Sequence, residues 1–504
     1  MSSLKRIMGN MMFLSVAKVI AAVLGFFYIT YTSRYLGPTN YGILAFALAL
    51  TGIFSVLANF GFDPLMIREV AKDKGSVSEF LANGLFLKTI CGIVATLAIV
   101  LVSVLFIDSS TSKIVTCLMA FSIVLSAISN VFSNIYQAFQ QLEYFSIGQI
   151  IHSALMLIFA VVGIYLDKSV IFFALNYVLS SLALLLFNIT ITTRNFARIN
   201  FSIDYGFLKR TIKDAWPFAL SAIFVSIFYW IDSIMLSFIN GDTAVGHYNA
   251  AYNLMMYSLF IPIIFNTVVF PILAGYALKP VTDGLSRVSE LYLRYMVILS
   301  VTLVTFMAIF APQIIITIYG VQYAPSIGAL QILIFSVAFV YLSSPFTRVL
   351  EVLNMQRLVM VITAFGACFN VIANIIVIPQ YSFYGASITT VLTELIMLIA
   401  MALSVYRVGI RHSKRIPLTF IKVCASAGIT FGVYYIISGS LGEITSILLL
   451  LCVYAATLLI LRVPDDYDIE LVQSILKGFK VRTILEHAVT LKRRKNQNEE
   501  SEEI

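Results

Sequence analysis

Five ionisable residues stand inside long apolar stretches of the sequence: the basic Lys18, Lys88 and Arg348 and the acidic Asp232 and Glu394. An ionisable side chain in the hydrocarbon layer of a membrane costs about 2.5 kcal/mol or more, so it normally faces a wet cavity or a charged partner. Basic side chains in such a cavity can offset the desolvation of an anionic phosphate head group. A buried carboxyl can take up and release a proton or a sodium ion. We therefore predict that the three basic residues bind substrate and that the two acidic ones are candidates for a coupling-ion site.

Each of these residues also has a structural explanation. A long basic side chain near the end of a span can snorkel to the cytoplasmic surface, which applies to Lys88 and Arg348. Arg348 can instead pair with Glu351, three residues further along a helix. Lys18 has little room to snorkel, because at about 1.5 Å per residue it comes near the middle of its span. Glu394 reaches a similar depth from the other half of the chain, so a structural salt bridge between these two is the alternative.

The composition predicts which elements must position these groups. Of 504 residues, 60% are hydrophobic and 12% are charged, whereas soluble domains carry roughly 25% charged residues. A spanning helix needs about 20 mostly apolar residues, because its backbone groups must pair with each other where water is absent. We predict an all-α polytopic membrane protein with about 14 transmembrane helices. These lie at residues 8–32, 41–62, 81–107, 114–139, 146–166, 170–192, 215–238, 247–273, 295–318, 327–353, 358–378, 384–406, 420–437 and 444–461.

The basic residues predict the orientation of these helices. Lysine and arginine are retained in cytoplasmic loops far more often than in translocated ones. If both termini are cytoplasmic, inner loops and termini hold about 27 of the 33 basic residues, and outer loops hold only Arg34, Lys113 and Lys168. We therefore predict a multi-pass protein of the cell membrane with both termini inside. The net charge of +8 reflects this topology, and no nucleic-acid partner is expected.

Several kinds of chemistry find no support in the sequence. The five cysteines lie in apolar stretches without CxxC spacing, which predicts neither disulfides nor a metal site. No HExxH motif, nucleophile elbow or P-loop occurs. The expected outer loops are short. We therefore expect no catalytic residues, no metal and no cofactor.

A short motif occurs twice, after the first and the seventh predicted spans. It reads G-P-T-N-Y-G from Gly37 to Gly42 and G-D-T-A-V-G from Gly241 to Gly246, with 204 residues between equivalent positions. Six predicted spans separate the copies, so both face the same side. This arrangement predicts a parallel repeat, in which two six-helix bundles are related by an axis along the membrane normal.

The repeat predicts a division of the chain into four parts. These are an N-terminal six-helix bundle at residues 1–200, a C-terminal six-helix bundle at 201–410, two extra helices at 411–462, and a cytoplasmic tail at 463–504. The tail combines an amphipathic stretch with charged residues, which is typical of a surface helix followed by a disordered end. Two bundles that face each other enclose a cavity, and rocking one against the other would expose it to each side in turn.

Several longer segments resemble a known family. The opening S-R-Y-L-G-P-T-N-Y-G and N-F-G-F-D-P-L-M-I-R-E-V-A, and later Y-W-I-D-S-I-M-L-S and V-G-H-Y-N-A-A-Y, are similar to polysaccharide transporters. So is the stretch from Asn370 to Glu394. These transporters belong to the multidrug/oligosaccharidyl-lipid/polysaccharide (MOP) exporter superfamily, and the likeness covers about residues 1 to 440.

The resemblance implies a function that composition and spacing alone do not. It implies a Wzx-type (O-antigen) flippase that translocates a polyprenyl-(pyro)phosphate-linked oligosaccharide by alternating access, with membrane lipids and H+ or Na+ as further partners. Contacts with polysaccharide assembly enzymes are also expected. Drug exporters of the superfamily typically have twelve spans, so the extra pair favours a lipid-linked cargo. An ion-coupled multidrug antiporter and a membrane-embedded glycan polymerase are the alternatives.

The charge bias predicts the result of a topology experiment. Reporter fusions after Leu273 and at the C-terminus should both read cytoplasmic, because each position follows an even number of spans. The measurement is the activity of a reporter that works on one side of the membrane only. An outside signal at either position would mean that a span has been miscounted.

Overall fold

The structure, a computed structural model, describes residues 3–196, 203–277, 283–413, 415–437 and 442–464. These residues are helical and contain no β-strand, which confirms the predicted all-α class. The chain divides into two compact units. Unit 1 comprises Met1–Ala250, Ile315–Ser326 and Ala367–Ala386, and unit 2 comprises Ala251–Ile314, Ile327–Gly366 and Ser387–Ile504. The division predicted from the repeat stays a prediction, and nearly all of the predicted tail lies outside the described residues.

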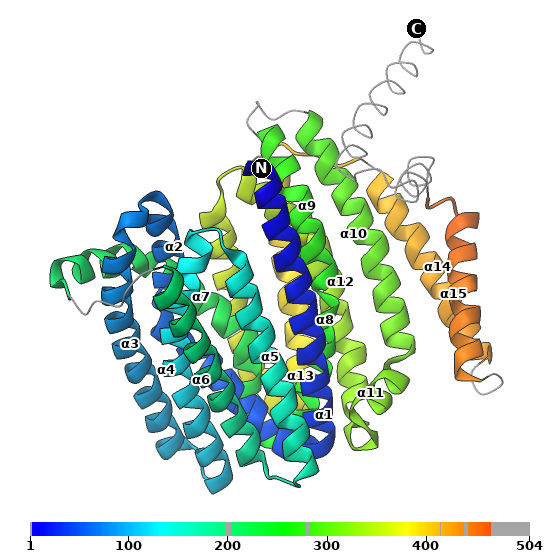
Figure 1. Cartoon of the computed structure of the whole chain (residues 1–504). Coiled ribbons are helices and arrows are strands. Elements are labelled where there is room, and N and C mark those ends of the chain that lie inside the picture. Colours follow the sequence, from blue (N-terminus) through cyan, green and yellow to red (C-terminus); the bar gives the residue numbers. More distant parts are fainter. Residues whose placement is uncertain (1–2, 197–202, 278–282, 414, 438–441, 465–504) are drawn as a thin grey trace. The chain divides into compact units, whose positions relative to one another are not determined.

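The helices follow one another with short connections (Figure 1). Their bounds are α1 Ser3–Asn59, α2 Phe62–Lys72, η1 Lys74–Ser76, α3 Val77–Phe106, α4 Ser110–Ala138, α5 Leu142–Tyr165, α6 Val170–Asn195, α7 Tyr205–Asn240, α8 Asp242–Ser258, α9 Phe260–Ala277, α10 Asp283–Ile309, α11 Ala311–Tyr319, η2 Val321–Tyr323, α12 Ser326–Val352, α13 Gln356–Arg407, α14 Arg415–Ile437 and α15 Glu443–Ile460. Within the described residues, 11 helical segments are long and apolar enough to cross a membrane, and α15 contains a shorter apolar one. The predicted total of about 14 spans and the side of the termini stay predictions.

Helices α1 and α13 each cover two predicted spans. Helix α1 has 57 residues, so a straight helix would be roughly 85 Å long, against a hydrocarbon layer of about 30 Å. It is interrupted at Gly37, with φ 72° and ψ 171°, a conformation open to glycine because it has no Cβ. Helix α13 is interrupted at Ser382. The predictions of loops at both places were therefore wrong. A single non-helical residue replaces each predicted loop, and most of the G-P-T-N-Y-G motif is helical.

The predicted span 247–273 is also discontinuous, because a proline interrupts it. Helix α8 ends at Ser258 and α9 begins two residues later. Pro262 has no N–H to donate to the carbonyl of Ser258, four residues before it. The hydroxyl of Tyr341 donates to that carbonyl instead, at 2.6 Å.

The predicted span 295–318 is broken in the same way between α10 and α11. Pro312 leaves the carbonyl of Ala308 without its helical donor. The side-chain amide of Gln331 donates to that carbonyl at 3.2 Å. Both spans were predicted as continuous, and both corrections follow from the missing N–H of proline.

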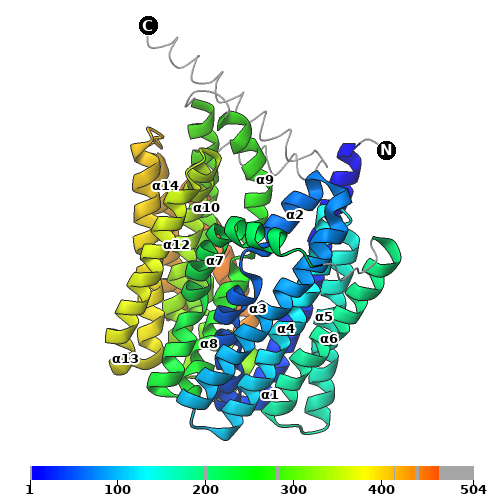
Figure 2. The ribbon, with the colours of Figure 1, turned by 90° about the vertical axis from the view of Figure 1, so that its left-hand side faces the viewer.

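Unit 1 contains the first six long helices of the chain. Helix α1 packs along α5, and α4 packs against both α3 and α6 (Figure 1 and Figure 2). The short helix α2 buries Phe62, Met66 and Val70 in a core that also contains Phe80 and Tyr136. This core holds α2 against the ends of α3 and α4, and thereby positions the polar residues at the start of α2.

Helix α3 shows how its surface suits a lipid environment. Leu97, Leu101 and Leu105 are 62%, 59% and 64% exposed, and their four-residue spacing places them on one face of the helix. The polar Lys88 and Ser103 of the same helix are buried. Apolar side chains therefore point outward and polar ones inward, as a bilayer requires.

Unit 2 contains the two extra helices, α14 and α15. Helix α14 packs against both α10 and α15 (Figure 1). Val423, Tyr454 and Val463 form a small buried core there. The hydroxyls of Thr302 and Tyr454 are 2.8 Å apart, and Arg294 donates to the carbonyl of Val463 at 2.9 Å. The extra pair is thus fixed to α10 by apolar packing and by hydrogen bonds.

Candidate functional site

The ammonium of Lys88 is enclosed by polar groups inside unit 1. Its Nζ lies 2.7 Å from Oδ1 of Asp63 and donates to Oδ1 of Asn59 at 2.6 Å. Asn134 of α4 donates to the same oxygen of Asp63 at 2.6 Å. The Lys88 side chain is 1% exposed. We call these four residues the Lys88 cluster. In it Lys88 is paired inside the bundle and does not extend to the surface.

The local sequence explains how the chain brings Asn59 and Asp63 to one ammonium. Phe60 and Gly61, between α1 and α2, both have left-handed backbone conformations, with φ 43° and 69°. Asp63 then lies in the first turn of α2, where the N-terminal end of a helix stabilises negative charge. A Cβ on Gly61 would lie 2.4 Å from the carbonyl oxygen of Ala215. Glycine is therefore required at position 61 both for its conformation and for space.

A second buried polar group surrounds Asp232 of α7, again within unit 1. The hydroxyl of Tyr248 donates to Oδ2 of Asp232 at 2.6 Å, and the amide of Asn374 donates to Oδ1 at 2.6 Å. Asn374 also donates to Oδ1 of Asn370 at 3.0 Å. These four residues, the Asp232 cluster, are all at most 4% exposed.

The Asp232 cluster joins three helices, α7, α8 and α13, through one carboxylate. Asn374 reaches across to α7 through its bond to Asp232, whereas Asn370 accepts from Asn374 within α13. The cluster also has the groups that a small cation needs, since Asp232 supplies a carboxylate and Asn370 an amide oxygen. It could accept either a proton or a sodium ion by exchanging these hydrogen bonds.

Arg348 lies in unit 2 and is partly exposed. Its Nη1 is 2.5 Å from Oε2 of Glu351, so the pairing expected at three-residue spacing is present. Its Nε is buried and has no hydrogen-bond partner among the residues that the structure describes. Close by in sequence, Ser344 donates to Asn266 at 3.1 Å, and its hydroxyl lies 2.9 Å from that of Tyr292. Arg348 therefore keeps one donor uncommitted beside a group of hydroxyls and an amide.

The remaining two candidates have contrasting surroundings. Lys18 of α1 is exposed, and so are its neighbours Val16, Val19 and Ile20. Glu394 of α13 is 6% exposed and makes no hydrogen bond or ion pair with any residue that the structure describes. The roles predicted for these residues stay predictions.

Lys88 was predicted as a site residue from the sequence, but its partner Asp63 was not. The sequence did contain a signal for Asp63, because an acidic residue that follows a glycine turn at the end of a span is well placed to begin a helix. Tyr248 was not predicted either, because its role depends on the packing of α8 against α7.

Comparisons with known proteins point to one family. A family model described as polysaccharide biosynthesis protein matches residues 7–276, more than half of the chain. An uncharacterized membrane protein of Methanocaldococcus jannaschii is 25% identical over 384 residues, which are 73% of this chain and 70% of that protein. A candidate O-antigen transporter of Shigella dysenteriae is 28% identical over 195 residues, 38% of this chain and 48% of the relative.

Solved structures share the fold. The lipid II flippase MurJ in an inward closed conformation superposes with a TM-score of 0.71 and 16% identity, covering 88% of this chain and 97% of that one. An inward-facing multidrug resistance MATE family transporter of the MOP superfamily gives a TM-score of 0.63 and 15% identity, covering 79% of this chain and 98% of that one. The chain therefore has the fold of these transporters, as the resemblance implied.

The Lys88 cluster predicts how stability responds to its loss. Lys88→Met should destabilise the protein by roughly 3 kcal/mol, because removing one partner of a buried ion pair leaves the other charge uncompensated. The double variant Lys88→Met/Asp63→Leu should recover most of that loss. The measurement is the thermal unfolding midpoint in detergent. Equal losses in the single and double variants would show that the two charges are not coupled.

Proposed function

Because this chain belongs to the polysaccharide biosynthesis protein family, we propose that it translocates a polyprenyl-(pyro)phosphate-linked oligosaccharide across the cytoplasmic membrane for cell-surface polysaccharide synthesis. The family match over residues 7–276 is the observation that carries this proposal. The chain is a multi-pass membrane transporter and not an enzyme, since its family and its structural neighbours are transporters. Contacts with the enzymes that assemble the polysaccharide are part of the proposal.

The cargo has an anionic head group, and basic residues at membrane depth supply the opposite charge. Lys18 is exposed on α1, so its ammonium is available to a phosphate. Arg348 has an Nε without a partner in the described part of the chain, which could donate to a second phosphate oxygen. Lys88 is already paired with Asp63, so it would bind cargo only if that pair opened. Lys18 is therefore the first candidate for a substrate contact.

Transport against a concentration gradient needs an energy source, and the chain contains no P-loop for ATP. We assign coupling to the Asp232 cluster, because a buried carboxylate with exchangeable hydrogen bonds can alternate between free and ion-bound forms. Glu394 is the second candidate, since it is buried without a polar partner in the described part of the chain. The coupling ion is a proton or sodium.

An ion-coupled multidrug antiporter is the alternative, because the MATE transporters share this fold. The two functions differ in their cargo. A drug antiporter carries compact, often cationic compounds and does not need a phosphate-binding cation, whereas a flippase for an anionic lipid does. A Lys18 variant therefore tests one function against the other.

Lys18→Ala should be present in the membrane at normal levels but should deliver lipid-linked sugar at roughly one tenth of the wild-type rate or less, because a hydrogen bond to a charged group contributes about 1.5–3 kcal/mol. Lys18→Arg should keep part of the activity, since it preserves the charge and changes the geometry. Lys209→Ala removes an exposed lysine from α7 and serves as the control. Full activity of Lys18→Ala in a flipping assay would remove this lysine from the substrate site.

Asp232→Asn should abolish the response of transport to an ion gradient, because the amide cannot bind a proton or compensate a sodium ion. Coupling between two sites commonly changes affinities by about fivefold or more, so the loss should be measurable. The assay compares proteoliposomes with and without an imposed Na+ or proton gradient. Ser233→Ala changes the adjacent buried residue and should respond as the wild type does. A gradient response that survives Asp232→Asn would shift the assignment to Glu394.

A further inference from the structure

The start of α7, residues 205–216, is set apart from the other long helices of unit 1 by its direction. In Figure 1 and Figure 2 it runs across α3 and α4 and not along them. We call these residues the α7 entry segment. The segment follows α6, whose last turn carries the exposed Arg194, on the side that the charge bias predicts to be cytoplasmic. We therefore expect it at the cytoplasmic surface of the membrane.

One face of the α7 entry segment is built into unit 1. Phe207 and Leu208 belong to the same buried core as Phe80 of α3, and the rings of Phe80 and Phe207 meet edge to face with their centroids 4.7 Å apart. The backbone N–H of Asp204, the residue that caps α7, donates to Oδ1 of Asn83 at 2.9 Å. The beginning of the segment is therefore fixed to α3.

The end of the segment is fixed to the turn between α1 and α2. Thr211 and Ala215 continue the buried face, with 5% and 1% exposure. A Cβ on Gly61 would lie 2.4 Å from the carbonyl oxygen of Ala215, so the backbone of α7 lies directly on this turn. Because both ends are fixed to unit 1, the segment has one defined inward face and one defined outward face.

The outward face combines large apolar side chains with lysines. Its five residues follow one another at intervals of four, three, one and three positions, which places them on one side of a helix: Tyr205, Lys209, Ile212, Lys213 and Trp216. Tyr205, Ile212 and Trp216 are 76%, 40% and 54% exposed, and both lysines are exposed as well. Neither lysine forms an ion pair with a residue that the structure describes.

Neighbouring charges leave these two lysines available to a ligand. Asp214 is about two and a half turns from Tyr205, so it points away from the outward face. On the adjacent helix α2 the exposed Arg68 and Lys72 are both paired with Glu69, at 2.7 Å and 3.1 Å. The outward face therefore carries positive charge that no carboxylate of the segment or of α2 neutralises.

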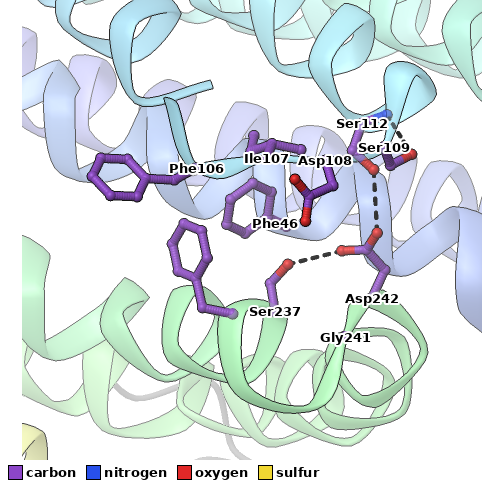
Figure 3. A pocket seen from close by; sticks show the side chains of 10 residues that line it. Phe46, Phe106, Ile107, Asp108, Ser109, Ser112, Ser237, Gly241 and Asp242 are labelled. Carbon is purple, nitrogen blue, oxygen red and sulfur yellow. Dashed lines mark hydrogen bonds between the residues drawn. The ribbon is translucent and has the colours of Figure 1, made fainter. Parts of the chain in front are cut away.

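A pocket at the other end of α3 has the opposite charge. Asp108 and Asp242 line this pocket of about 180 Å³, and no basic residue does. Ser112 and Ser237 donate to the two oxygens of Asp242 at 3.2 Å and 2.8 Å, and Figure 3 shows both serines pointing at this carboxylate. The 30 residues of α3 separate the two places by about 45 Å. An anion would be attracted to the outward face of the α7 entry segment and repelled at this pocket.

The residue types on the outward face suit a lipid surface. Tryptophan and tyrosine collect at the level of lipid head groups, and an amphipathic helix that lies in the membrane surface places its apolar side chains at the boundary between head groups and acyl chains. Lysine can lay its aliphatic part along that apolar surface and extend its ammonium to a phosphate. Clusters of basic residues on such a helix attract the anionic lipids of the cytoplasmic leaflet.

We propose that the α7 entry segment is a binding site for anionic phospholipids of the cytoplasmic leaflet. Lys209 and Lys213 bind the phosphate of the head group, and Tyr205, Ile212 and Trp216 pack against the glycerol and the upper acyl chains. The bound lipid holds the start of α7 at the membrane surface. The site needs only residues of unit 1 and does not depend on which cargo the protein carries.

Tryptophan quenching tests this site, because the chain has only two tryptophans, Trp216 and Trp230. The Trp230→Phe variant is reconstituted in phosphatidylcholine vesicles that contain dibrominated phosphatidylglycerol or dibrominated phosphatidylcholine, since bromine quenches tryptophan on contact. Phosphatidylglycerol should bind beside Trp216 about fivefold more tightly or better, since each basic residue near an anionic surface contributes about that factor. The double variant Lys209→Gln/Lys213→Gln should bring the ratio of the two binding constants close to one.

Two control variants accompany this measurement. Trp216→Phe leaves Trp230, which packs against Gly52 of α1 and should report equal binding of the two lipids. Lys113→Gln removes a lysine at the other end of unit 1 and should leave the preference at Trp216 unchanged. In protein that keeps both tryptophans the double lysine variant should again remove the preference, so the result does not depend on the Trp230 replacement.

Three results would overturn the proposal. Equal quenching of Trp216 by the two lipids would mean that the face does not select anionic lipid. A preference that survives the loss of both lysines would place the binding site elsewhere. Quenching by neither lipid would place Trp216 in water and would favour an acidic soluble partner.

Discussion

Polar groups of the backbone cannot stay unpaired where water is absent, and this constraint decides where the helices of this chain can bend. Pro38 leaves the carbonyl of Arg34 without its helical donor, and Gln322 supplies the missing hydrogen bond. The two breaks in unit 2 follow the same rule, with a tyrosine and a glutamine as substitute donors. These three interruptions therefore depend on a side chain from another part of the sequence.

The same constraint sorts the ionisable residues. Lys88 and Asp63 neutralise each other, and Asp232 is bonded by a tyrosine and an asparagine. These groups are built into the packing, whereas Lys18 is exposed. A transporter for an anionic lipid needs some basic side chains that are exposed, as Lys18 is. A cation that is already paired inside a bundle has few donors left for a phosphate. The contrast between Lys18 and Lys88 follows from their neighbours and not from their residue type.

The sequence alone was enough to predict the helical class, the membrane setting and the family resemblance, and it offered the pairing of Arg348 with Glu351 as the alternative to a substrate contact, because these depend on composition or on spacing along one helix. It failed where distant residues decide the outcome. Loops were predicted at Gly37 and Ser382, but single non-helical residues suffice there. Asp63 was overlooked because its partner comes from another helix. The repeat was found as a sequence pattern, yet nothing local indicated that a hydrogen bond would join the threonines of its two copies.

If the cargo is an anionic lipid-linked glycan, the protein should flip such a lipid in proteoliposomes. The purified protein is reconstituted with a fluorescent polyprenyl-pyrophosphate-linked oligosaccharide, and external dithionite destroys the fluorophores in the outer leaflet only. In protein-free vesicles about half of the signal should survive, since lipids distribute over both leaflets of a bilayer that ionised head groups rarely cross. With the protein present, we expect nearly all of the signal to be lost as cargo moves between leaflets. Survival of half the signal, in vesicles that do accumulate a lipophilic cationic drug, would contradict the account and favour the antiporter.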